Sequence, residues 1–276
     1  MFGKLMKYEL RHLIRIFAPM WAIVTILCVL SRLTIKPNLD GFFYAEGAAA
    51  IMPVMFLLLS VFGILTMMIV AAVVLIQRFH KGMYGDEGYL MFTLPVTTGQ
   101  LVNAKALSAL LLMLATELVT ILGIAVMVSY PDLWREAVSA IGIDLRTAIS
   151  LLLDMSGVTE SQAIAMLCWS AVLMPVELLC GIYTVYLAIS VGQLWRKHPV
   201  AGGILSWYAL VLLVGALESL LQQALGISPM EMLMEGVEVS MQSWQMMLFS
   251  TVESLVLCVI FFFGTKLIMD KKLNIM

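Results

Sequence analysis

Long apolar runs, separated by short polar stretches, dominate the pattern of this 276-residue chain. A helix that crosses the hydrocarbon of a bilayer needs about 20 consecutive, mostly apolar residues. Six runs fit this requirement, at residues 16–33, 48–77, 101–129, 163–194, 200–221 and 245–268. Backbone polar groups in lipid must be paired within their own segment, so these runs predict helices and not open strands. We therefore expect an all-α integral membrane protein with six transmembrane helices, forming a single membrane domain over residues 1–276.

The composition agrees with a membrane protein and excludes most other classes. Hydrophobic residues make up 62% of the chain and charged residues 12%, whereas soluble domains carry about 45–50% and about 25%. A soluble fold of this size cannot hide so much apolar surface from water. Soluble enzymes, nucleic-acid-binding proteins and secreted disulfide-rich domains are thereby excluded as main interpretations, and we expect no nucleic-acid partner.

Residue types that carry chemistry are few and scattered along the chain. The four cysteines lie inside apolar runs, which predicts inert thiols without a disulfide framework. The three histidines lie in three separate segments, so no metal site is expected. The chain contains no G-x-x-x-x-G-K-[ST] phosphate-binding loop, no H-E-x-x-H and no G-x-S-x-G motif. We expect no catalytic residue, no metal and no cofactor in this chain, and do not predict an enzyme.

Lysine and arginine are divided unequally between the two sides of the predicted helices. Twelve of the 16 fall on the side that holds both chain ends, and the other four are Arg32, Lys36, Arg135 and Arg146. Cytoplasmic loops of membrane proteins carry an excess of these residues. The distribution therefore predicts that both termini are cytosolic in a multi-pass protein of the cell membrane.

The N-terminal segment, residues 2–17, has the pattern of an amphipathic helix. One face carries Lys4, Lys7, Arg11 and Arg15, and the other carries Phe2, Leu5, Met6, Leu13 and Phe17. Such a helix is typical of an anchor at the inner membrane surface, where each base near anionic lipid contributes on the order of 1 kcal/mol. An additional contact with a cytosolic partner stays open as an alternative.

The longest loop on the predicted cytosolic side, residues 78–100, combines glycine, acidic and aromatic residues. Asp86 and Glu87 are adjacent acids on an otherwise basic side, and three glycines around them permit tight backbone paths. Exposed aromatic residues beside fixed charges are typical of protein docking elements. An amphipathic turn that rests on the membrane fits the same pattern. Further along, Thr97 and Gln100 have capping-box spacing and predict a helix start just after Pro95.

Two carboxylic acids lie near the middle of predicted transmembrane helices. A charge at this depth costs roughly 2.5–3.5 kcal/mol on insertion scales, so Glu117 and Glu177 should be protonated, hydrogen-bonded or near water. Thr120 and Thr184 lie on the polar stripes of the same two segments. Such stripes occur where membrane helices pack closely and where they line a substrate pathway. Both interpretations stay open for these four residues.

Two segments of the chain resemble a known family. The N-terminal run FGKLMKYELRHLIRIFAPM and the loop run GDEGYLMFTLPVTTGQLVNAKAL are similar to type-2 permease subunits of bacterial ABC transporters, particularly Gram-positive peptide and multidrug exporters. The resemblance implies a bacterial cytoplasmic membrane protein. It also implies an N-terminal elbow helix over residues 1–15 and a short cytosolic coupling helix around Gly85–Phe92, within the loop 78–100 between the second and third transmembrane helices.

The resemblance further implies partners and a function. Two permeases, either two copies of this chain or this chain and a homologous permease, would form a dimer, and each would dock on a separate ATP-binding cassette ATPase that binds ATP and Mg. The residues carried over as the ATPase-docking surface are Tyr84, Gly85, Asp86, Glu87, Gly88, Tyr89 and Phe92. The implied function is peptide export, including antimicrobial peptide and toxin secretion, or export of hydrophobic drugs. The alternative is a non-transporting immunity or sensor protein that binds peptides in the membrane.

Overall fold

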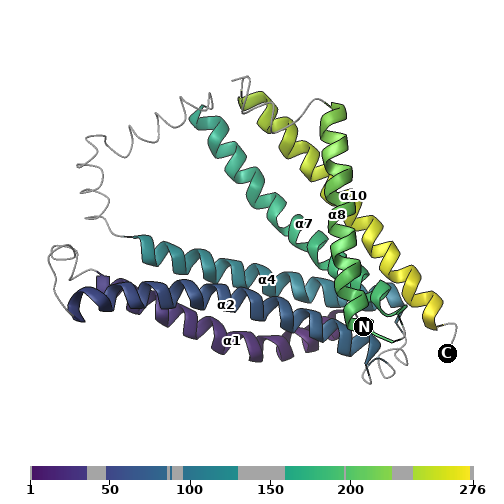
Figure 1. Ribbon diagram of the computed structural model, residues 1–276, viewed down its shortest axis with the longest axis horizontal. Coiled ribbons are helices and arrows are strands. Elements are labelled where there is room, and N and C mark those ends of the chain that lie inside the picture. Colours follow the sequence, from purple (N-terminus) through teal and green to yellow (C-terminus); the bar gives the residue numbers. More distant parts are fainter. Residues whose placement is uncertain are drawn as a thin grey trace. The chain divides into compact units, whose positions relative to one another are not determined.

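The computed structural model describes residues 2–35, 48–85, 88, 96–129, 159–195, 197–225 and 239–273. Within these ranges the regular structure is helical (Figure 1). The six long helices are α1 (Phe2–Ile35), α2 (Ala48–Tyr84), α4 (Thr98–Val128), α7 (Glu160–Gly192), α8 (Pro199–Leu225) and α10 (Val239–Leu273). Each of them contains a segment long and apolar enough to cross a membrane. The prediction of an all-α protein with six such helices is confirmed for the described part of the chain.

The helices are longer than the apolar runs that predicted them, because their polar ends continue the same helix. α1 runs without a break from Phe2 to Ile35, so the elbow segment expected over residues 1–15 is not a separate element here but the first part of α1. At 1.5 Å per residue its 34 residues extend about 51 Å, against a hydrocarbon thickness of about 30 Å. α2 likewise continues past the predicted end at residue 77 to Tyr84. The expected coupling helix falls mainly on residues outside the described ranges.

The chain divides into two compact units. The first comprises Met1–Lys81 and Leu107–Leu145, and thus contains α1, nearly all of α2 and the larger part of α4. The second comprises Gly82–Ala106 and Arg146–Met276, and contains the last residues of α2, the first part of α4, and α7, α8 and α10. Helices α2 and α4 therefore contribute residues to both units.

The first unit is built by three helices that run side by side (Figure 1). Buried Val24 and Cys28 of α1 pack with Met67 of α2 in a core to which α4 contributes Val119. The helices approach closely at Gly123, where an added methyl group would lie 3.0 Å from the Cys28 sulfur. Apolar packing and small residues at the interface are the means by which helices associate in lipid.

In the second unit α7 is the central helix, because it packs against both α8 and α10 (Figure 1). Thr159 and Gln162 form a capping box at the start of α7. At its other end α7 turns sharply into α8. A methyl group added to Gly192 would lie 2.5 Å from the Cα of Gly203 on α8, so the two backbones are in direct contact. Only glycine permits this approach.

Candidate functional site

The loop between α2 and α4 contains the residues predicted to dock a partner. Tyr84, Gly85 and Gly88 are described, whereas Asp86, Glu87, Tyr89 and Phe92 lie outside the described residues. The Gly88 N–H donates to the Gly85 carbonyl over 2.8 Å. A methyl group added to Gly88 would lie 2.8 Å from the carbonyl oxygen of Met83. The chain therefore turns tightly as it leaves α2, and Gly88 has no room for a side chain.

The last residue of α2 is hydrogen-bonded to α7. The Tyr84 hydroxyl donates to Ser190 Oγ over 2.8 Å. Ser190 Oγ in turn donates to the Tyr186 carbonyl over 2.7 Å, and Ser190 is fully buried. The Tyr84 hydroxyl thus has its hydrogen-bond partner within the second unit. A contact between this residue and an ATPase stays a prediction.

The first turn of α4 is held by its own cap and by α10. Thr97 and Gln100 exchange hydrogen bonds, with N–O distances of 3.3 and 3.4 Å, so the predicted capping box is confirmed. Next to it, the Thr98 hydroxyl donates to Asp270 Oδ1 on α10 over 2.6 Å. Gly99 lies against α10 too, since a methyl group added there would lie 3.4 Å from the Phe262 ring.

Further along α4, Asn103 and Lys105 contact other helices of the second unit. The Tyr183 hydroxyl of α7 donates to Asn103 Oδ1 over 2.6 Å, and its ring packs edge-on against Phe262 at 5.8 Å. Lys105 is only 4% exposed. A methyl group added to Gly82 would lie 2.5 Å from Lys105 Nζ, so the cation lies against the end of α2. A positive charge in this place interacts favourably with the helix dipole.

Together these contacts fix both ends of the loop on the same unit. We use the name loop anchor for the three hydrogen-bonded pairs Tyr84–Ser190, Thr98–Asp270 and Asn103–Tyr183. They connect the end of α2 to α7, and the start of α4 to both α10 and α7. The sequence predicted the loop but not these pairs, whose members are 80 to 172 residues apart.

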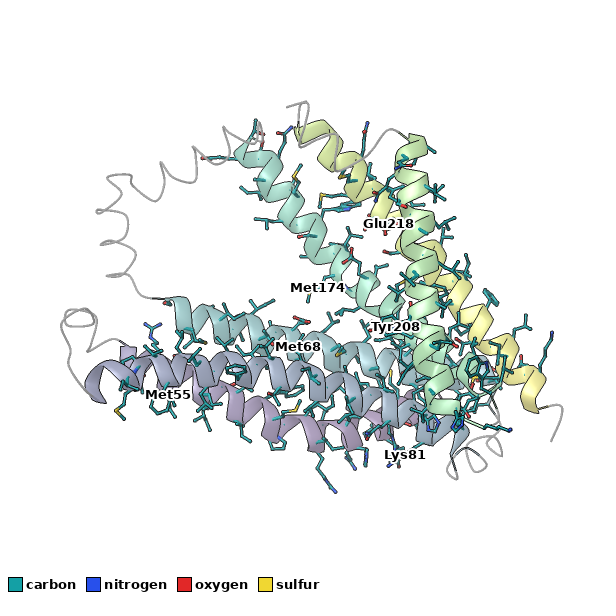
Figure 2. All side chains as sticks on the ribbon, viewed as in Figure 1. Met55, Met68, Lys81, Met174, Tyr208 and Glu218 are labelled. Atoms are coloured by element: carbon teal, nitrogen blue, oxygen red, sulfur yellow. The ribbon has the colours of Figure 1, made fainter. Side chains whose placement is uncertain are left out.

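The threonines of α4 lie at a packed interface of the first unit. Thr120 Oγ1 donates to the Thr116 carbonyl over 2.9 Å and lies 3.9 Å from the sulfur of Met68 on α2, which Figure 2 labels. Thr116 Oγ1 accepts a hydrogen bond from Trp21 Nε1 of α1 over 3.1 Å. Both threonines are buried, and Glu117 between them is half-buried. These are helix-packing contacts, while a pathway role for Glu117 and Thr120 stays a prediction.

Glu177 and Thr184 of α7 differ in their surroundings. Glu177 is exposed, and its Oε1 accepts a hydrogen bond from Ser250 of α10 over 3.3 Å. Thr184 is half-buried and donates to the Cys180 carbonyl of its own helix over 2.8 Å. No group of three metal-ligating side chains occurs among the described residues, these two helices included. Their role in a pathway or an interface stays a prediction.

The bases of the N-terminal segment are exposed, whereas part of its apolar face is buried within the protein. Lys4, Lys7, Arg11 and Arg15 are all exposed on α1. Leu13 and Phe17, which the pattern assigned to the apolar face, are buried within the protein, and Phe17 packs edge-on against Trp21 at 5.9 Å. The role of the four bases as a membrane-surface anchor stays a prediction.

Comparison with protein-family models, with curated proteins and with solved structures finds no match in any of the three.

Proposed function

We propose that this chain is a permease subunit of an ATP-driven ABC exporter, and that it forms a translocation pathway together with a second permease. Three features support the proposal: six helices of spanning length, a loop with the acidic pair Asp86–Glu87, and the resemblance of the loop run to type-2 permeases. The observation that carries it is the loop anchor, because it links the segment where a partner would bind to two of the long helices.

ATP would be hydrolysed by a separate subunit. The chain carries no phosphate-binding loop of the G-x-x-x-x-G-K-[ST] type. In the proposed complex the partner ATPase therefore holds ATP and Mg, and the loop between α2 and α4 is its docking surface. The acidic pair supplies charge, and the neighbouring Tyr89 and Phe92 supply the aromatic contact area that docking surfaces use.

The mechanism follows from the connections of the loop. Closure of two ATPase subunits around ATP pulls on the docked loops, and the loop anchor passes this displacement to α7 and α10. The pathway between the two permeases then changes from inward to outward access. ATP can drive this change only if the closed ATPase binds one permease state better than the other, since a ligand shifts an equilibrium by its differential affinity alone.

The cargo that suits this chain is a hydrophobic or amphipathic molecule taken from the membrane. Many large apolar side chains are exposed on the described helices, and few charges lie within the spanning segments. Antimicrobial or toxin-type peptides and hydrophobic drugs have this character. A highly charged, water-soluble cargo would need a polar route that these surfaces do not offer.

The decisive experiment reverses the charge of the loop. In the double variant D86K/E87K, ATPase recovery with the tagged chain and cargo-stimulated ATP turnover should both fall by about tenfold or more, as expected when docking hot spots are lost. The matched control is E235K/E238K, which reverses two acids in the segment between α8 and α10, predicted to be external. It should leave both quantities unchanged.

The same two variants separate the proposal from its alternative. A strain that lacks this chain should lose secretion of, or resistance to, its peptide, and E235K/E238K should restore it while D86K/E87K should not. Full restoration by D86K/E87K, with no ATPase recovered, would instead support a membrane immunity or sensor protein that works without ATP.

A further inference from the structure

The first half of α1 presents a basic face that the loop and its anchor do not use. Lys4, Lys7, Arg11 and Arg15 recur at intervals of three and four residues and are all exposed. The opposite side of the same segment is buried, as Leu13 and Phe17 show most clearly. The fold therefore turns the bases away from the protein.

These bases have no counter-charge within the described part of the chain. The ion pair found there joins Glu9 of α1 to Arg78 of α2, and it involves none of the four. Four unneutralised cations within about three helical turns repel one another. An external anion that contacts several of them at once relieves this repulsion.

The basic face continues into a lipid-facing one. Ile26, Val29 and Leu33 lie on the same side of α1, three to five turns beyond Arg15, and all three are exposed. In a membrane these side chains contact acyl chains, since α1 contains a spanning segment. Arg15, the last of the four bases, directly precedes the predicted spanning run, where that lipid-facing surface meets the headgroups, and this favours lipid over a cytosolic protein as the occupant.

An exposed aromatic residue lies in the middle of the basic face. Tyr8 is 69% exposed, with Lys4 four residues before it and Arg11 three residues after it, so the three side chains are neighbours on the helix surface. Tyrosine is enriched at membrane–water interfaces because its ring is apolar and its hydroxyl polar. Lysine and arginine around it reach phosphate with their charged ends while their stems cover apolar surface.

From these observations we propose that Lys4, Lys7, Tyr8, Arg11 and Arg15 form a binding surface for the headgroups of anionic phospholipids, in the leaflet where α1 begins. The recognised chemistry is the phosphate-bearing headgroup with a net negative charge. Zwitterionic lipids of the same chain length bind more weakly. The inference does not depend on the proposed transport function, because binding is measured on this chain alone.

The test compares phosphatidylglycerol with phosphatidylcholine of identical acyl chains, titrated into the purified full chain in a neutral detergent. Bound lipid is counted by native mass spectrometry. The variant K4Q/K7Q/R11Q should lose roughly fivefold in phosphatidylglycerol affinity for each base removed, with phosphatidylcholine unaffected. The matched control K81Q/K197Q/K271Q removes three exposed bases from other helix ends, including Lys81 in the last turn of α2 (Figure 2), and should retain the preference.

Several results would overturn the inference. One is an unchanged preference for phosphatidylglycerol in K4Q/K7Q/R11Q, and another is an equal loss in the control, which would indicate diffuse attraction without a site. Effective competition by inorganic phosphate at the same concentration would indicate a small-anion site in place of a lipid surface. If the triple variant does not fold, the single variants K4Q and K7Q serve, each with an expected loss of about fivefold.

Discussion

Glu9 of α1 is 3% exposed in its side chain, and its Oε2 accepts a hydrogen bond from Arg78 Nε of α2 over 3.0 Å. Burying a carboxylate is tolerated when a cation neutralises it, and removal of one partner leaves the other charge desolvated. The pair therefore holds the first part of α1 beside the last part of α2, seven residues before Gly85 and the loop.

Single removal of either partner should destabilise the protein. We expect E9A and R78A each to lower the free energy of unfolding by about 1–3 kcal/mol, less than for a fully buried pair because Arg78 is 24% exposed. In the double variant the unfolding free energy should fall by less than the sum of the two single losses, with a coupling energy of about 0.5–3 kcal/mol. Denaturant unfolding in detergent measures all three, and R11A, an exposed base on the same helix, is the control. Strict additivity would contradict the pair's role.

Contacts between residues close in sequence were predictable, whereas contacts between distant residues were not. The capping box of Thr97 and Gln100 follows from a three-residue spacing, and the structure confirms it. Glu9 and Arg78 are 69 residues apart, and the sequence shows only a lone acid within a basic segment. The burial of Lys105 was likewise not predictable from the sequence, because a lysine at a predicted helix start is ordinarily solvated.

At the level of helices, hydropathy located all six spanning elements, since about 20 apolar residues in succession leave few other options in lipid. The polar ends were harder to place. A hydropathy pattern assigns residues 78–84 to a loop, but their backbone continues α2, which the buried Phe79 and Met83 stabilise by packing. Packing of buried side chains likewise explains why the expected elbow is continuous with α1, where Leu13 and Phe17 are buried.

The turn from α7 to α8 offers a sharp test of helix packing. In G192A the new methyl group would meet the backbone of Gly203, which has no flexible side chain to move aside. We expect a loss of about 1–3 kcal/mol or more in unfolding free energy, as in overpacked cores. On the same helix, Gly181 has open space around it. The control G181A should therefore be neutral or more stable by about 0.5–1 kcal/mol, because alanine is the better helix former.

Equal stabilities of G192A and G181A would show that the two backbones are not in contact. A selective loss in G192A would also bear on the loop anchor, because Ser190 lies two residues before the contact on the same helix. A shift of the α7 end would then weaken the bond that Tyr84 donates to Ser190.

For the whole molecule, the orientation in the membrane decides which of the proposed surfaces can meet its partner. The unequal distribution of lysine and arginine, 12 against four, predicts that the loop after α2, the α7–α8 turn and both chain ends are cytosolic. An ATPase can reach the loop only from that side. The anionic lipid surface on α1 depends less on the side, although the cytoplasmic leaflet carries the stronger negative surface potential.

Cysteine labelling in intact cells tests this orientation. The native thiols are free, and Cys168 is exposed on α7, so C168S is the background. A membrane-impermeant maleimide should label R135C, in the segment between α4 and α7, and should leave K197C in the α7–α8 turn unlabelled until the cells are opened. The opposite pattern would place the Asp86–Glu87 pair outside the cell. No cytosolic ATPase could then bind the loop. The proposed transport function would therefore be wrong, even if every contact of the loop anchor were correct.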